Sequence, residues 1–379
     1  MASARQPLAG LTVIAIEQAV AAPFCTSRLA DAGARVIKIE RPEGDFARGY
    51  DDVALGQSSY FVWLNRGKDS LVLDLASAEG KQSLRGLLAT ADVLVQNLKP
   101  GALDRLGFGP AMLRKAHPRL ICCSISGYGE TGPLAQRKAY DLLIQAESGL
   151  SSITGGPEAP ARVGVSLVDI ATGATAHAAI LEALIARGIT GEGAEIQVSM
   201  FDVMADWLTV PLLQHEGGKP PKRLGLAHPS IAPYGVFATR DGSNILVSIQ
   251  SEREWAKFCT AFLHAPGLIT DPRFARNVDR VAHRPETDAI VAAAFAALDL
   301  AEAKTLLLAA DAAFAVVNDM AALSTHPQLR RITTQTPAGP VDLPAPAAIT
   351  VGAGRSYGPV PAIGEHAPLG DNAAGPARP

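Results

Sequence analysis

The first third of the chain alternates short apolar runs with helical segments. The run Leu11–Ile16 (LTVIAI) has no regular polar alternation, which is typical of a strand buried on both faces. A helix is expected from about Pro23 to Ala32, followed by a second strand at Arg35–Ile39. Because parallel strands need a crossover between them, this order predicts a parallel sheet covered by helices.

The alternation continues, with strands expected at 70–75, 92–96 and 120–125 and helices at 77–89, 104–108 and 110–116. Such a pattern predicts a doubly wound, Rossmann-like α/β domain. A nicotinamide cofactor is not expected, because the first strand is followed by Ala19–Pro23 and not by the Gly-rich turn that approaches a pyrophosphate. The polar stretch 45–59 predicts a loop.

A second domain is expected after a basic, Pro- and Gly-rich segment at 215–223, which has the composition of a linker. The predicted division is a large α/β domain over 1–215 and a smaller α+β domain over 216–320, with a hairpin around Asp241-Gly242. Over 321–379, prolines are expected to interrupt any strand or helix. Three apolar residues, Val341, Leu343 and Ile349, are expected to anchor this segment to the rest of the chain, and the tail 367–379 is expected to be disordered.

Composition excludes several classes of function. The net charge of −3 and the pI near 6.3 give no basis for nucleic-acid binding. The four cysteines form no CxxC pair, so neither a zinc site nor a disulfide framework is expected. We expect no membrane association and a cytoplasmic location, because the sequence predicts neither a signal peptide nor an apolar run of about 20 residues.

Asp169 is the lone carboxylate in the segment 162–173, where an apolar strand is expected to meet a helix of small residues. An aspartate beside a core is either a helix N-cap or a reactive group, and the local pattern favours the cap. The small residues after it leave room for a ligand.

Several motifs in this order resemble the family III CoA-transferases, a group that includes formyl-CoA transferase, carnitine CoA-transferase and the α-methylacyl-CoA racemases. The residues that carry the resemblance are PLAGL at 7–11, ARVIKIER at 34–41, NRGK at 65–68, NLKPGALDRLGF at 97–108, SGYG at 126–129, Tyr140-Asp141 and TGEG at 190–193.

The resemblance implies two interlocked, ring-shaped protomers, with a large domain built from both chain ends. It also implies that Asp169 is a nucleophile that forms a mixed anhydride and then an aspartyl-CoA thioester. Coenzyme A or an acyl-CoA is then a substrate, and no permanent cofactor or metal is implied. The residues implied to contact CoA are Ala21, Arg41, Leu73, Asn97, Leu98, Arg105 and Lys138.

Tyr140 stands where the racemases of this family have a histidine base. A phenol with an ordinary pKa near 10 is a poor base at neutral pH, which favours a transferase. The segment 223–234 resembles the succinyl-CoA-dependent enzymes that use small dicarboxylic acids. Tyr140, His228, Ser230 and Arg48 are therefore the expected substrate-pocket residues, although a histidine in a Pro-rich turn is more often structural.

Three alternatives remain open from the sequence. CoA transfer between the two carboxylates of one acid would use the same Asp169. Racemisation is disfavoured by Tyr140. A non-catalytic CoA-binding protein is disfavoured by the joint presence of Asp169, Arg41 and Arg105.

Overall fold

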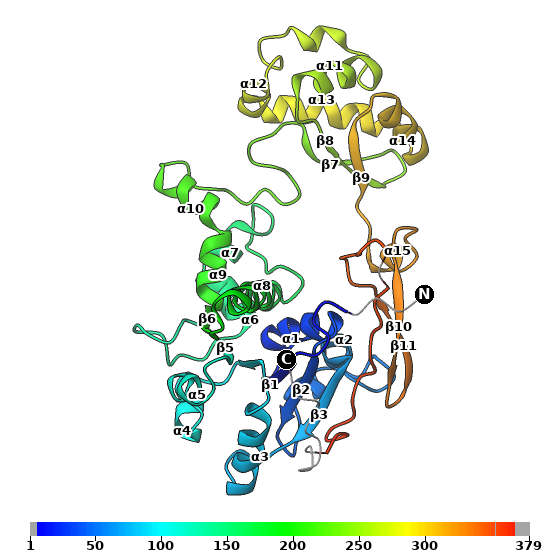
Figure 1. Cartoon of the computed structure of the whole chain (residues 1–379). Helices are drawn as coiled ribbons and strands as arrows, with labels where there is room; N and C mark the ends of the chain where they lie inside the picture. Colours follow the sequence, from blue (N-terminus) through cyan, green and yellow to red (C-terminus); the bar gives the residue numbers. More distant parts are fainter. Residues whose placement is uncertain (1–5, 353, 368–379) are drawn as a thin grey trace. The chain divides into compact units, whose positions relative to one another are not determined.

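The computed structural model describes residues 6–352 and 354–367 and divides into two compact units (Figure 1). Unit 1 contains the described residues up to Leu150, the segment Val163–Val210 and those from Arg330 onward. Unit 2 contains Ser151–Arg162 and Pro211–Leu329. The second unit thus takes in Ser151–Arg162, which was expected in the large domain.

A six-stranded parallel sheet organises unit 1. Its strands are β1 (Thr12–Ile16), β2 (Arg35–Glu40), β3 (Lys68–Val72), β4 (Val93–Gln96), β5 (Ile121–Ser126) and β6 (Glu195–Ser199). The spatial order β3-β2-β1-β4-β5-β6 reverses direction between β1 and β4. This is the order of doubly wound dinucleotide-binding folds, in which ligands bind where the order reverses.

The third strand begins earlier and ends earlier than the expected range of 70–75. Lys68 was read as part of a basic turn, but it pairs with Val36 in the sheet, and its side chain is buried against Glu17. A lysine is rarely buried unless it is paired, so the polar pattern concealed the start of this strand.

Helices cover both faces of the sheet. Those of unit 1 are α1 (Ala21–Asp31), α2 (Ser59–Asn65), α3 (Ala78–Leu88), α4 (Ala102–Leu106), α5 (Pro110–Ala116), α6 (Asp141–Glu147), α8 (Leu167–Thr190) and α9 (Met200–Trp207), with a 3₁₀ turn at Phe46–Gly49. The helices α1 and α8 share a core with one face of the sheet, and α3 to α5 share a core with the other. The helix α2 begins at Ser59, the last residue of the loop expected over 45–59. Two short helices, α7 (Leu150–Ile153) and α10 (Thr209–Glu216), each contain residues of both units.

Helix α8 has 24 residues and ends at Gly191, whose φ of 79° suits glycine. By length and composition alone it is apolar enough to cross a membrane, although no apolar run of that length was expected. It packs against α1, α9, β5 and β6, however, as the core helix of a globular unit does.

The C-terminal part of the chain contains a hairpin that was not expected. Strands β10 (Arg331–Thr336) and β11 (Gly339–Pro344) pair antiparallel despite two prolines in β11. Each strand of this two-stranded sheet is an edge strand, where a missing N–H is tolerated. Val341 and Leu343 pack against a cluster formed by Phe61, Val62 and Val360, as expected, whereas Ile349 is exposed.

The segment after the hairpin returns to the edge of the parallel sheet. The main-chain N–H of His366 donates to the Ser70 carbonyl, and its Nδ1 accepts from the Ser70 N–H. These bonds cover part of the β3 edge. The expected disordered tail lies outside the described residues, apart from Ala367.

Unit 2 is an α+β unit. Its strands β7 (Tyr234–Ala238), β8 (Asn244–Ser248) and β9 (Ala313–Val316) form an antiparallel sheet. Its remaining helices are α11 (Glu252–Ala261), α12 (Asn277–Ala282), α13 (Arg284–Ala296), α14 (Leu300–Ala309) and α15 (Met320–Ser324), with a 3₁₀ turn at Pro266–Ile269. The expected hairpin is formed by β7 and β8. The hydrophobic core of unit 2 includes Trp255, Phe258 and Phe295.

The buried carboxylate of Glu40 makes the stability of unit 1 depend on pH. Burial opposes its ionisation, but Arg48, Lys38 and Ser70 outweigh burial and lower the pKa of Glu40 from 4.5 to about 2. A carboxyl whose pKa is lower in the folded state adds stability above its unfolded pKa and loses it as the pH falls toward 2. We expect Glu40→Gln to lower the unfolding free energy of unit 1 by about 3 kcal/mol at pH 7. The difference should shrink below pH 4.5.

Urea unfolding of both proteins at pH 7 and pH 3.5 measures this effect. The control is Glu79→Gln, because Glu79 is exposed in the first turn of α3. An equal loss of stability at both pH values would contradict the electrostatic explanation.

Candidate active site

Asp169 lies in the first turn of α8, two residues after the helix begins at Leu167. The residues before it form no strand, so the expected junction of a strand and a helix is wrong. Asp169 is not the N-cap either, since that position belongs to Ser166, whose side chain makes no capping bond. The local prediction of a cap therefore does not apply to Asp169.

The cap of α8 is supplied by Asp141, from the first residue of α6. Its Oδ1 accepts from the main-chain N–H of Val168 at 2.7 Å and of Asp169 at 3.2 Å. Its Oδ2 accepts from Gln145 Nε2 at 2.7 Å. Gln145 in turn accepts through Oε1 from the N–H of Val163. Asp141 thus ties the start of α8 to α6 and satisfies two helix donors that would otherwise lack partners.

Two like charges therefore lie close together at the start of α8. Burial and the neighbouring Asp141 carboxylate raise the pKa of Asp169 to about 7. Desolvation and a nearby like charge both disfavour the ionised form. A carboxyl perturbed in this way is a candidate for a reacting group, although Asp169 is not among the residues that line the cavity described below.

The small residues after Asp169 serve the packing of two helices. A Cβ added at Gly173 would lie 2.4 Å from the Ala21 carbonyl oxygen and 2.9 Å from Phe24 Cβ. The residues Ala171–Gly173 are helical, so their N–H groups bond within α8 and are not free for a substrate. At Gly173, the space beside the helix is therefore occupied by α1, whereas Ala174 and Ala178 are exposed.

A cavity of about 600 Å³ opens at the carboxyl ends of the strands β1 to β4, around the point where the strand order reverses. Its lining residues are Ile16–Gln18, Ile39–Asp45, Leu73–Ala76, Leu98 and Leu106. Three of the expected CoA contacts, Arg41, Leu73 and Leu98, therefore lie around one cavity. The place agrees with the general rule for ligand sites in open parallel sheets.

The other expected CoA contacts are not in the lining. Asn97 exchanges two hydrogen bonds with the main chain of Gln18, which does line the cavity. Ala21 is the buried first residue of α1. Arg105 in α4 and Lys138 before α6 are exposed.

The expected substrate-pocket residues belong to both units. Arg48 forms a two-pronged pair with Glu40 at 2.7 and 2.9 Å, and its guanidinium lies 3.7 Å from the Phe61 ring centre. Arg48 is therefore already paired with Glu40 in this fold, and its expected contact with the substrate stays a prediction. Tyr140 is exposed immediately before Asp141, whereas His228 and Ser230 belong to unit 2.

A buried ionic network under the cavity was not foreseen from the sequence. Glu17 pairs with Lys68 at 2.6 Å and with Lys38 at 3.4 Å, and Lys38 pairs with Asp45 at 2.9 Å. Asp45 also accepts from the N–H of Ala19, which has a positive φ of 63°. The network thus holds the turn between β1 and α1. The one feature of the sequence that could have revealed this network is Lys38, which interrupts an apolar strand.

An aromatic cluster near Asp169 was also missed, because the segment before α2 was read as a loop. Tyr50 and Tyr60 pack edge to face at 5.4 Å, and Tyr60 packs in a cluster that includes Ile170, the neighbour of Asp169. Burial, Asp45 and Asp169 raise the pKa of Tyr50 to about 12, so its hydroxyl stays protonated. The helical spacing of Phe61, Val62 and Leu64 was the signal that could have revealed α2.

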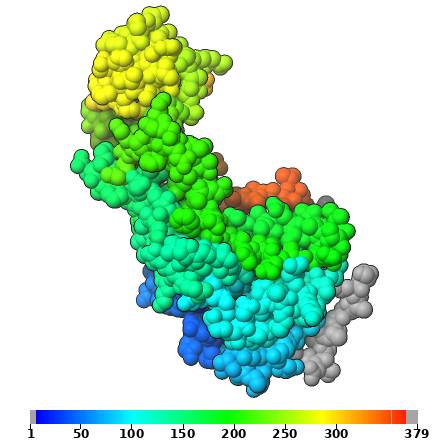
Figure 2. All heavy atoms as spheres, turned by 90° about the vertical axis from the view of Figure 1, so that its left-hand side faces the viewer, coloured from blue at the N-terminus to red at the C-terminus, as the bar shows by residue number. Residues whose placement is uncertain are grey.

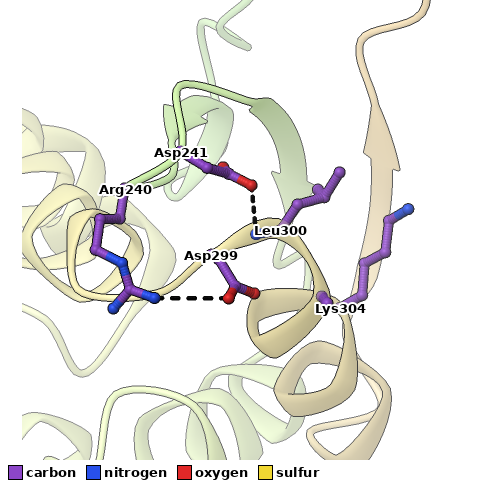
Figure 3. A pocket seen from close by; sticks show the side chains of 6 residues that line it. Arg240, Asp241, Asp299, Leu300 and Lys304 are labelled. Atoms are coloured by element: carbon purple, nitrogen blue, oxygen red, sulfur yellow. Dashed lines mark hydrogen bonds and ion pairs between the residues drawn. The ribbon is translucent and has the colours of Figure 1, made fainter.

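Unit 2 has a shallow hollow of about 620 Å³ lined by Arg240, Asp241, Asp299 and Lys304 (Figure 3). Arg240 pairs with Asp299, and Asp241 accepts from the N–H of Leu300, so most of its charged groups already have partners (Figure 3). It is a weaker candidate than the cavity of unit 1. Within residues 6–352 and 354–367, no three His, Cys, Asp or Glu side chains gather to hold a metal ion.

Comparison with known proteins agrees with this arrangement. The sequence profile of CoA-transferase family III matches residues 8–367. The acetyl-CoA:oxalate CoA-transferase of Acetobacter aceti is 42% identical over 301 residues, covering 77% of this chain and 75% of that protein. The succinate–glutarate CoA-transferase of Agrobacterium fabrum (strain C58) is 39% identical, with the same coverage. The crystal structure of a CAIB/BAIF family protein from Brucella suis has a TM-score of 0.82 at 34% identity, covering 96% of this chain and 97% of that one.

The profile spans nearly the whole chain, and the matched relatives carry named CoA-transferase activities. The fold, the cavity at the reversal point and these matches together show that the chain belongs to CoA-transferase family III and is a CoA-transferase.

Proposed function

We propose that the protein transfers CoA from an acyl-CoA, such as succinyl-CoA, to a small dicarboxylic acid, with Asp169 as the nucleophile. The observation that carries the proposal is the position of Asp169 in the first turn of α8, where burial and the Asp141 carboxylate, which accepts from its main-chain N–H, raise the pKa of Asp169 to about 7. The same unit holds the ligand cavity. The matched relatives named for glutarate and oxalate support a dicarboxylic acid as acceptor.

The proposed reaction begins when a carboxylate oxygen of Asp169 attacks the carbonyl carbon of the thioester. The C–S bond breaks, leaving a mixed anhydride and the CoA thiolate. The thiolate then attacks the aspartyl carbonyl, which releases the donor acid and forms the aspartyl-CoA thioester. The acceptor carboxylate reverses these two steps with a new acyl group, so charges and protons balance without an added acid.

The local structure supports a nucleophile that is only half ionised near neutral pH. A higher pKa accompanies a more basic oxygen, while desolvation removes water that would shield it. The first-turn N–H groups of Val168 and Asp169 already donate to Asp141. The donors that stabilise the oxyanions must therefore come from other groups.

The cavity supports binding of the nucleotide end of CoA. Arg41 offers a planar cation suited to stacking or to phosphate oxygens, and Leu73 and Leu98 offer apolar contacts. Ala76 also lines the cavity, at a position where the resemblance implies a lysine in one family member. Because alanine cannot bind a phosphate, another residue must supply that contact. Arg105 and Lys138, both exposed, are the proposed phosphate partners.

We also propose that the protein is an interlocked homodimer, as the family resemblance implies. Several large apolar side chains on the helices of unit 1 are exposed, which a single chain has no reason to maintain. They are Leu142, Leu143, Ile185, Ile189, Trp207 and Val210. Figure 2 shows one face of the molecule, on which the green segment that includes α8 and α9 lies at the surface.

Light scattering should give a mass of twice 39.4 kDa, and a monomer mass at micromolar concentration would contradict the dimer.

Two other reactions are less well supported. A racemase needs a second base, and Tyr140 is a phenol, which is a poor base at neutral pH. An isomerase would move CoA within one acid and would need no acceptor. The following assay separates these alternatives.

We expect turnover to require a second acid. A panel of acyl-CoA donors is tested against acceptor acids of increasing length, with the new thioesters separated by chromatography. Glutarate, oxalate and succinate should accept CoA better than monocarboxylic acids of matched length. Rearrangement or epimerisation of one acyl-CoA without any acceptor acid would contradict intermolecular transfer.

We expect Asp169→Asn to lower kcat by about 10³-fold or more, because the amide cannot form the anhydride. In the wild type, aspartyl thioester formation should fall tenfold per pH unit well below pH 7, since the protonated carboxyl is not nucleophilic.

Asp141→Asn keeps an oxygen for the two N–H groups of α8 but removes the like charge. It should therefore move this acid limb to lower pH.

Single-turnover rates between pH 5 and pH 8.5 measure both effects. The control is Asp104→Asn, which makes the same change of charge in α4. An unchanged acid limb in Asp141→Asn would show that Asp169 does not set it.

A further inference from the structure

A second cavity of unit 1, of about 470 Å³, shares no lining residue with the ligand cavity described above. Two of its walls are the helices α1 and α8, which pack against each other and are labelled in Figure 1. The segment before β1 and the segment after β11 supply the rest. All four parts belong to unit 1, so the cavity lies within one compact body.

Three of the side chains that line this cavity are basic, namely Arg28, His177 and Arg355. The Nε of Arg355 is buried and has no hydrogen-bond partner within residues 6–352 and 354–367. A guanidinium keeps its charge in proteins, so its donors cannot be silenced by loss of a proton. A buried donor without an acceptor costs free energy, and an anionic ligand would remove that cost.

The acidic side chain in the lining, Asp31, is already shared between two arginines. Arg66 donates to both oxygens of its carboxylate, and Arg28 Nη1 donates to one of them at 3.3 Å. The Arg28 guanidinium is also held over the Phe24 ring, 4.4 Å from its centre. Because one carboxylate serves two guanidinium groups, the cavity keeps a net positive charge even before Arg355 is counted.

His177 lies on α8, four residues before Leu181, which lines the same cavity. Burial lowers the pKa of His177, and the charges of Arg28 and Arg355 lower it further, so the ring is neutral at pH 7. Both guanidinium groups therefore lie near this ring. A neutral imidazole offers an N–H donor without adding a charge.

A contact between the two chain ends holds Arg355 in place. Gln6 Nε2 donates to the hydroxyl of Ser356, the residue after Arg355, at 3.0 Å. Gln6 itself precedes Pro7, which lines the cavity. The position of Arg355 is thus fixed by a residue 350 positions earlier in the chain.

The location of the cavity limits the charge of its ligand. Arg28 and Asp31 lie in the last turn of α1, and the C-terminal end of a helix carries a partial negative charge. A phosphate dianion would meet this charge and that of Asp31. A carboxylate carries a single charge, and its two oxygens match the fork of one guanidinium.

The remaining walls indicate the body of the ligand. Phe24, the aromatic residue of the lining, already contacts Arg28 and packs edge to face with Trp63. The other apolar lining residues are aliphatic side chains and prolines, which suit an alkyl chain better than a nucleobase. They are Pro7, Leu8, Ala32, Leu181 and Pro346–Ala348.

We propose that this cavity binds an aliphatic monocarboxylate, with its carboxylate between Arg28 and Arg355 and its chain along the apolar walls. Side chains that served only to pack the C-terminal segment would leave no buried guanidinium donor unpaired. The site is separate from the cavity proposed for CoA and does not depend on the proposed transfer reaction.

The first probe is octanoate, measured by isothermal titration of the full-length protein with CoA at saturation. One octanoate should bind per chain. The affinity should rise about threefold to fourfold with each methylene added from butyrate to octanoate, until the cavity is full. Octyl phosphate should bind more weakly than octanoate at pH 8. No binding of octanoate, or tighter binding of octyl phosphate, would overturn the proposal.

Arg355→Met should weaken octanoate binding by about tenfold to a hundredfold, which is typical of losing a hydrogen bond to a charged group. Arg355→Lys keeps the charge without the fork and should weaken it less. Neither change should alter transfer from succinyl-CoA to glutarate, which also shows that the variants fold. The matched control is Arg85→Met, because Arg85 is exposed on α3 and does not line this cavity.

Two results with these variants would overturn the proposal. One is octanoate binding that Arg355→Met leaves unchanged. The other is a change from dimer to monomer in Arg355→Met by light scattering, which would assign Arg355 to a contact between subunits.

The wild type supplies a readout that needs no variant. Octanoate bound beside Arg28 and Arg355 should shift the ring NMR signals of His177. It should leave those of His117, at the end of α5, unchanged. Binding of octanoate without a shift at His177, or with equal shifts at both rings, would place the acid elsewhere and overturn the proposal.

Discussion

The contact on which the site depends is the one between Asp141 and the first turn of α8. The Asp141 carboxylate accepts from the N–H groups of Val168 and Asp169, which fixes the helix end from outside the helix. A capping interaction of this kind contributes about 1 kcal/mol to a helix. It also places a negative charge beside Asp169. The interaction that orders the helix therefore raises the pKa of the group that we propose to react.

The ligand cavity depends on a second buried arrangement, in a different part of the sheet. The ionic network of Glu17, Lys38, Lys68 and Asp45 lies under the turn between β1 and α1. Buried ion pairs often contribute little net stability, but losing one partner leaves an uncompensated charge. The network therefore specifies the geometry of this turn and of the cavity wall more than it adds to the stability of the fold. Glu40 and Arg48 extend it toward β3 and the C-terminal segment.

The periodicity of the sequence predicted the parallel sheet and its helices because buried parallel strands are nearly continuous apolar runs. The prediction was wrong where polar residues are buried. Lys68 looked like a turn residue because its partner, Glu17, is 51 residues away. The strand β11 was missed because its prolines are tolerated only at an edge, which the local sequence does not reveal.

For the site, the family resemblance singled out Asp169, Arg41, Leu73 and Leu98, and the last three line one cavity. Local reasoning assigned the helix cap to Asp169, whereas the cap is Asp141, a residue 28 positions earlier. Arg48 was expected near the substrate, and its pairing with Glu40 was not foreseen. Both differences arise from contacts between side chains that are distant in sequence, which spacing alone does not encode.

The central claim is that Asp169 becomes covalently linked to CoA. The most direct measurement is mass spectrometry of the enzyme quenched in acid after mixing with succinyl-CoA and no acceptor. The account predicts a mass increase equal to CoA less one water, located on the peptide that contains Asp169 and removed by hydroxylamine. Rapid transfer to an acceptor acid with no adduct on that peptide, or with the adduct on another residue, would contradict it.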